Sequence, residues 1–76
     1  MALMSATYEA SRRVTSNTPE VVASAVREAI QELRDTLQRH GIAAAFDDLA
    51  RLGHTESWDG EGQRWVHVSW EGEEAG

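Results

Sequence analysis

The segment from Thr18 to His40, TPEVVASAVREAIQELRDTLQRH, constrains the fold most, because it is the one long stretch with an unbroken helical period. Its apolar residues recur every three or four positions, so they fall on one face of a helix, and charged residues fill the other face. The apolar positions are Val22, Ala25, Val26, Ala29, Ile30, Leu33 and Leu37. The pattern predicts an amphipathic helix with one buried side, around which shorter elements are arranged.

Both ends of this helix carry residues that helix termini prefer. Thr18 suits the N-cap, since its hydroxyl can accept a hydrogen bond from a first-turn N–H. Pro19 suits the first helical position, where its missing N–H costs nothing. At the other end, Gly41 is the natural left-handed residue after the cap. We therefore expect the helix to end just before Gly41 and Ile42 to contact Leu37.

Four shorter elements are predicted around the long helix. Residues 6–14, ATYEASRRV, alternate between apolar and polar positions and predict a first strand. Residues 42–52 repeat at helical spacing and predict a second helix that Gly53 ends. Residues 54–58 and 63–70 flank DGEG, whose two acid–glycine steps favour a hairpin.

Together these elements predict a small single domain of the α+β class over residues 1–76. The expected order is β-α-α-β-β, with a long and a shorter helix packed on one face of an antiparallel sheet that ends in a C-terminal hairpin. With only Gly41 between them, the helices should form a tight corner or a hairpin. Residues 1–5 are expected to be a loose N-terminus, and 71–76 an acidic, flexible tail.

Size and composition limit the classes of protein to which this chain can belong. A chain of 76 residues buries only about 60% of its unfolded surface, so a partner would stabilise it, and a homodimer is one way to provide one. No run approaches the roughly 18 apolar residues of a membrane span, and the first residues lack the regions of a secretory signal. The chain has no cysteine, which fits a reducing compartment. We expect a cytoplasmic protein without membrane association.

The charge is acidic and uneven. The formal net charge is −6, and from Glu56 onward six acidic residues stand against Arg64 alone. A nucleic-acid-binding surface would be basic, so direct nucleic-acid binding is not expected. An acidic patch of Glu56, Asp59 and Glu61 could instead imitate nucleic-acid phosphates. All seven basic residues are arginine, a bias that indicates a high-GC genome such as that of an actinobacterium or one of its phages.

The sequence carries no motif that indicates catalysis. None of its serines lies in a G-x-S-x-G turn, and its glycines do not follow a strand into a helix. If the hairpin is centred on Gly60 and Glu61, His54 faces His67, and these with Glu56 could hold a metal. DGEG also permits bulged turns, which would shift this pairing. No ligand spacing supports such a site. We therefore predict no catalytic residue, no metal and no cofactor, and expect a protein that is not an enzyme.

Three tryptophans lie in the last quarter of the chain. Tryptophan and arginine dominate binding hot spots in protein interfaces. In the same hairpin register, Val66, Val68 and Trp70 face the helices, so Trp58 and Trp65 face outward together. The alternative is that these rings cover a small core or the back face of the hairpin itself. The predicted interface comprises Trp58, Trp65, His67, Glu56 and Arg64.

The stretch AFDDLARLGHTESWDGEGQRWVHVS resembles the end of a winged-helix domain, in which a helix ending in Leu-x-x-Leu-Gly leads into a two-stranded wing. The resemblance covers residues 42–70 and implies duplex binding that depends on Arg51 and Arg64. The acidic composition favours another function, a non-enzymatic regulator or inhibitor that binds another protein. A winged-helix-like DNA-binding or accessory transcription factor is the alternative.

Overall fold

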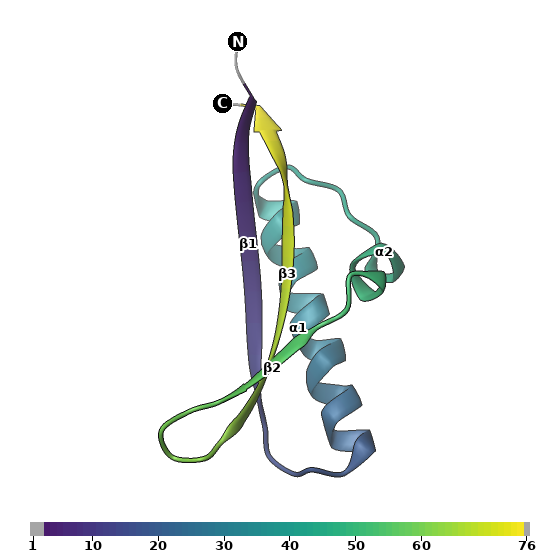
Figure 1. Ribbon diagram of the computed structural model, residues 1–76. Coiled ribbons are helices and arrows are strands. Elements are labelled where there is room, and N and C mark those ends of the chain that lie inside the picture. The colour runs from purple at the N-terminus through teal and green to yellow at the C-terminus, as the bar shows by residue number, and fades with distance from the viewer. Residues whose placement is uncertain (1–2, 76) are drawn as a thin grey trace.

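The computed structural model describes residues 3–75 of the chain, and the side chains of residues 5–72. Its elements are β1 (Leu3–Val14), α1 (Pro19–Arg39), α2 (Phe46–Arg51), β2 (Thr55–Trp58) and β3 (Arg64–Ala75). The strands form one antiparallel sheet in the order β1-β3-β2, with β3 in the centre. Both helices lie on one face of this sheet (Figure 1). The predicted α+β class and element order are confirmed.

The core lies between α1 and the two long strands. Ala10 of β1 faces Val68 of β3, and both are buried with Leu33, Leu37 and Leu49 in one cluster. Alternate residues of β3 therefore point toward the helices, as the strand period predicts. The other face of β3 carries the intervening polar and aromatic side chains, and no helix of the described residues covers it.

The C-terminal end of α1 is formed as predicted. Gly41 has a φ of +77°, and its N–H donates to the carbonyl of Gln38 at 3.0 Å. The N–H of Ile42 donates to the carbonyl of Leu37 at 2.9 Å. These two bonds define a Schellman ending. Ile42 packs against the core from this position.

The N-terminal end of α1 differs from the prediction. Pro19 begins the helix, and Thr18 has the extended backbone of an N-cap, but its side chain makes no capping hydrogen bond. The predicted hydroxyl cap is therefore wrong. The carbonyl of Thr18 accepts from the N–H groups of Val21 and Val22, each at 3.1 Å.

The second helix is shorter than predicted. It begins at Phe46 rather than Ile42 and ends at Arg51, and residues 42–45 form an irregular connection. The Schellman ending turns the chain out of the axis of α1 and directs Ile42 onto the core, so these residues cannot continue as a helix. The expected tight corner between two adjoining helices is therefore wrong.

Both long strands extend beyond their predicted limits. β1 begins at Leu3 and β3 continues to Ala75, in an unbroken register with each other. Residues 3–5 and 71–75, which were expected to belong to a loose N-terminus and a flexible tail, lie in these two strands, where each segment supplies the other with backbone partners. Met1, Ala2 and Gly76 lie outside the described residues.

The C-terminal hairpin is confirmed, but its register is shifted by one residue. Thr55 faces His67 and Glu56 faces Val66, whereas the expected register placed His54 opposite His67. Because side chains alternate between faces, this shift moves every residue of β2 to the other side relative to β3.

Asp59 sets this register. Its N–H donates to the carbonyl of Gln63 at 3.0 Å, and its Oδ1 accepts from the N–H groups of Glu61 and Gln63 at 2.9 and 3.0 Å. Gly62, with φ +79°, provides the left-handed residue that a three-residue hairpin loop requires. The loop is therefore centred on Glu61.

Candidate protein-interaction surface

The shifted register divides the predicted interface between the two faces of the hairpin. Glu56, Trp58 and Arg64 lie on the helix side, and Trp65 and His67 lie on the open face. The expectation that Trp58 and Trp65 share an outward face is therefore wrong. The structure instead forms two smaller polar groups, one on each face.

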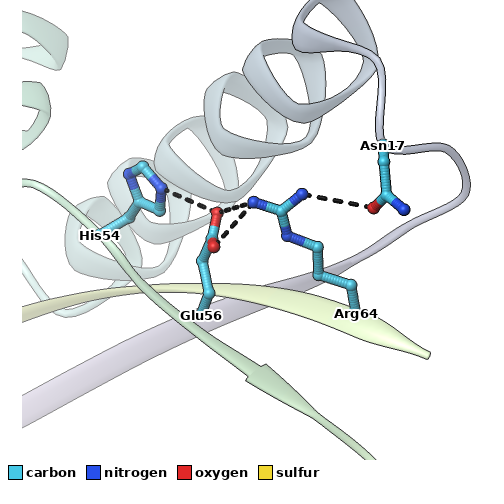
Figure 2. A network of polar contacts seen from close by, with 4 residues as sticks. All are labelled: Asn17, His54, Glu56 and Arg64. Atoms are coloured by element: carbon cyan, nitrogen blue, oxygen red, sulfur yellow. Dashed lines mark hydrogen bonds and ion pairs between the residues drawn. The ribbon is translucent and has the colours of Figure 1, made fainter. Parts of the chain in front are cut away.

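The first group, the Arg64 network, comprises Asn17, His54, Glu56 and Arg64 (Figure 2). Nη2 of Arg64 donates to both carboxylate oxygens of Glu56, at 2.6 and 2.7 Å. Nη1 of Arg64 donates to Oδ1 of Asn17 at 3.3 Å. Nε2 of His54 lies 3.5 Å from Oε1 of Glu56. The network joins the β1–α1 loop to both strands of the hairpin, so it fixes the position of the hairpin on the domain.

The positive charge of Arg64 and the negative charge of Glu56 are paired with each other inside the protein. The side chains of Arg64 and Glu56 are 23% and 25% exposed. The hydrogen bond from Arg64 lowers the pKa of the Glu56 carboxyl from its ordinary value of 4.5, against the opposing effect of desolvation. Glu56 is therefore ionised at neutral pH and bound to Arg64, so it has a structural role in the hairpin.

Trp58 is the exposed aromatic residue beside the Arg64 network. It lies at the end of β2 and is 63% exposed. The guanidinium carbon of Arg64 lies 5.9 Å from its ring centroid, within the range of a cation–π contact. Trp58 also borders a groove of about 190 Å³ between the β1–α1 loop and the hairpin, lined by Val14, Thr15, Ser16, Asn17, Gly62, Gln63 and Arg64.

Trp65 is held on the open face by the turn. Its Nε1 donates to Oδ2 of Asp59 at 2.9 Å. This bond and the N–H of Gln63 lower the pKa of the Asp59 carboxyl from its ordinary value of 3.8. Two members of the predicted acidic patch, Glu56 and Asp59, thus use their carboxylates within the hairpin. The patch does not present three free charges to a partner.

The second group, the His67 row, comprises Ser11, His67 and Ser57 on three neighbouring strands of the open face. Nδ1 of His67 lies 2.7 Å from the hydroxyl of Ser11, and Nε2 lies 2.7 Å from the hydroxyl of Ser57. Oε1 of Glu9 lies 3.6 Å from the same Nδ1. Sequence reasoning missed this row, because the contact of Ser11 with His67 depends on the pairing of β1 with β3.

The His67 row has the first element of a nucleophilic site, a serine hydrogen-bonded to a histidine. Acyl transfer also requires a shaped substrate pocket and donors for an oxyanion. Three concave regions of the described surface, beside α1, beside α2 and beside the hairpin, are lined by neither Ser57 nor His67. Hydroxyl groups can donate or accept, so the row satisfies both ring nitrogens of His67 and joins the three strands.

The two histidines of the hairpin do not converge. His67 lies on the open face with Ser11 and Ser57, whereas His54 contacts Glu56 on the helix side. Among the side chains that the structure describes, no three His, Cys, Asp or Glu residues are grouped as metal ligands. The hypothetical site of His54, His67 and Glu56 is therefore not formed.

Comparisons with protein-family models, with curated proteins and with solved structures found no match. Across the described part of the chain, neither helix combines the length and hydrophobicity needed to cross a membrane.

Proposed function

We propose that this chain is a small, acidic, non-enzymatic module that binds another protein as a regulator or inhibitor, with Trp58 as its main contact residue. The observation that supports this proposal is an indole 63% exposed at the end of β2, close to the loop of a fixed hairpin. Large aromatic rings that enter a partner's pocket dominate the energy of many interfaces. A single exposed tryptophan beside an arginine is typical of such a contact.

The hairpin that carries Trp58 is preorganised for binding. The Arg64 network ties its strands to the β1–α1 loop, and Asp59 closes its turn through two backbone N–H groups. A segment that is ordered before binding loses less conformational entropy when a partner docks. The guanidinium of Arg64 lies beneath the indole, so it limits the positions the ring can take.

The test is affinity capture with the tagged full-length chain from a lysate of the source cell, with and without nuclease. Trp58→Ala is expected to weaken capture of the partner by at least about 2 kcal/mol, or roughly thirtyfold in Kd. Leu52→Ala is the matched control, since Leu52 is 59% exposed and lies outside the hairpin. Its capture should equal that of the unmodified chain.

The outcomes separate the two function classes. A protein that survives nuclease and is lost only with Trp58→Ala supports the proposal, and capture that this substitution leaves unchanged contradicts it. Nucleic acid, or proteins that disappear with nuclease, would favour the winged-helix alternative. Both arginines of that alternative contact acidic side chains: Arg51 lies 3.6 Å from Asp48, and Arg64 binds Glu56.

A further inference from the structure

Among the residues that the structure describes, β1 presents a long, regular edge that pairs with no other strand. It has twelve residues and pairs with β3 on one side only (Figure 1). Alternate N–H and C=O groups along its other side therefore point out of the sheet. Such a row of groups is a template for a further strand.

Monomeric proteins usually blunt their sheet edges with short strands, proline, bulges or charged side chains, above all lysine. The opposite edge of this sheet is blunted, because β2 has four residues. β1 contains no proline, glycine or lysine, and its register with β3 continues through all twelve pairs without a bulge. The charged residues of this edge, Glu9, Arg12 and Arg13, are of both signs, so the edge is suited to pairing with a strand whose charges match them.

The charges on β1 indicate which strand pairs with it. Glu9 and Arg13 stand four residues apart, both exposed on the open face. When two identical strands pair antiparallel with the helices of both copies on one side, residues at equal distances from the centre face each other. A register centred on Ser11 therefore places Glu9 of each copy opposite Arg13 of the other. Registers centred on Glu9 or Arg12 bring like charges together.

The register centred on Ser11 also gives acceptable side-chain pairs on the face of β1 that carries the helices. Tyr8 faces Val14 of the second copy, and both positions adjoin apolar core residues. Ala10 faces Arg12, whose Nη2 lies 3.4 Å from a carboxylate oxygen of Glu32 on α1. Arg12 keeps Glu32 as its ion-pair partner, so the contact between the two copies leaves no unpaired charge on the helix side of the sheet.

We propose that β1 pairs antiparallel with β1 of a second copy of this chain, centred on Ser11, to form a continuous six-stranded sheet. The inference does not rest on the proposed function. Trp58 lies at the end of β2, the opposite edge of the sheet, so both copies keep it available for another protein.

The first test is the mass of the purified full-length chain by sedimentation equilibrium. The unmodified protein is expected at twice 8.4 kDa. Glu9→Arg and Arg13→Glu each create two like-charge contacts and are expected to be monomeric at concentrations where the unmodified chain is dimeric. An equal mixture of the two variants restores opposite charges at both contacts and is expected to dimerise. Far-UV circular dichroism of each variant checks that it is folded.

The second test is a cross-link that does not depend on charge. The chain has no cysteine, so Ser11→Cys introduces one thiol, which the proposed register places next to its counterpart. Mild oxidation is expected to give a covalent dimer, since directly opposed residues in antiparallel strands have suitable separations. Thr7→Cys is the control, because Thr7 faces Thr15 in this register, so this variant should form no covalent dimer on oxidation.

A monomeric unmodified chain at every concentration overturns the proposal. A dimer that persists in both single-charge variants, or a mixture that stays monomeric although both variants are folded, also overturns it. Cross-linking through Thr7→Cys rather than Ser11→Cys overturns the register. Trp58→Ala should leave the mass unchanged, so loss of partner capture and loss of the dimer are distinguishable results.

Discussion

Trp70 and Gly72 act together at the end of β3. The indole of Trp70 packs against the core beside Tyr8, with ring centroids 6.1 Å apart. A Cβ at residue 72 would come within 2.5 Å of Cη2 and 2.6 Å of Cζ2 of this indole. The absence of a side chain at Gly72 therefore allows the ring to lie along the strand and cover the sheet where α1 no longer does.

Gly72→Ala is expected to destabilise the fold by about 1–3 kcal/mol, because the added methyl group forces the indole of Trp70 out of its packed position. Gly60→Ala is the matched control, since a Cβ there meets no atom within 4 Å, and its effect should stay within about 0.5 kcal/mol. Urea unfolding followed by far-UV circular dichroism measures both. Equal midpoints for the two variants would contradict this account of Gly72.

At the scale of elements, the two ends of α1 are stabilised differently. The C-terminal end depends on the left-handed conformation of Gly41 and on two backbone hydrogen bonds. The N-terminal end depends on Pro19 and the backbone of Thr18, with no capping hydrogen bond from the threonine hydroxyl. The two ends should therefore respond differently to alanine.

Gly41→Ala is expected to cost about 1–2 kcal/mol, because an alanine in the left-handed region is strained. Thr18→Ala is expected to cost only a few tenths, well below the ~1 kcal/mol typical of a threonine whose hydroxyl caps a helix. Thermal unfolding of both variants under one set of conditions is the measurement. A cost for Thr18→Ala equal to that of Gly41→Ala would show that the hydroxyl does cap the helix in solution.

Elements governed by local signals could be predicted from the sequence. The period and the glycine of α1 act within one or two turns, so its limits and its Schellman ending were predicted correctly. The start of α2 and the ends of β1 and β3 depend on contacts between distant segments. Ile42 is drawn onto the core, and Leu3 is paired with Ala75. No local pattern encodes these contacts.

The prediction of the candidate surface was limited in the same way, because its geometry also depends on contacts that no local pattern encodes. Its residue types, tryptophan, arginine and histidine in one hairpin, could be identified from the sequence. Their faces could not, because they depend on whether Asp59 closes a three-residue or a two-residue loop. A register difference of one residue separates Trp58 from Trp65 and turns Glu56 toward Arg64.

At the scale of the whole molecule, the sheet has one short and one long edge, and each is suited to a different interaction. The short edge ends at Trp58, on a hairpin fixed by the Arg64 network. The long edge is the whole of β1. A contact at one edge leaves the other free, so self-association and binding of another protein can coexist in one assembly.

Acid sensitivity is a further property of the whole molecule, and it follows from two carboxylates in the hairpin. Hydrogen bonds from Arg64 lower the pKa of Glu56 from 4.5, and hydrogen bonds from Trp65 and Gln63 lower that of Asp59 from 3.8. A pKa lower in the folded than in the unfolded state means that the unfolded chain takes up the proton first. This contribution to stability is complete above the unfolded-state pKa and is lost as the pH falls through the folded-state pKa.

The free energy of unfolding is therefore expected to begin falling below about pH 4.5, with Glu56 acting first and Asp59 at lower pH. Glu56→Gln removes one titrating group, so the difference in stability between this variant and the unmodified chain should shrink as the pH decreases from 4.5. Arg64→Gln removes the donor instead of the acceptor and should reduce the same part of the pH dependence. Urea titrations at a series of pH values, followed by circular dichroism, measure all three proteins. A constant difference between Glu56→Gln and the unmodified chain at every pH would mean that the Arg64–Glu56 contact does not hold the carboxyl in its ionised form.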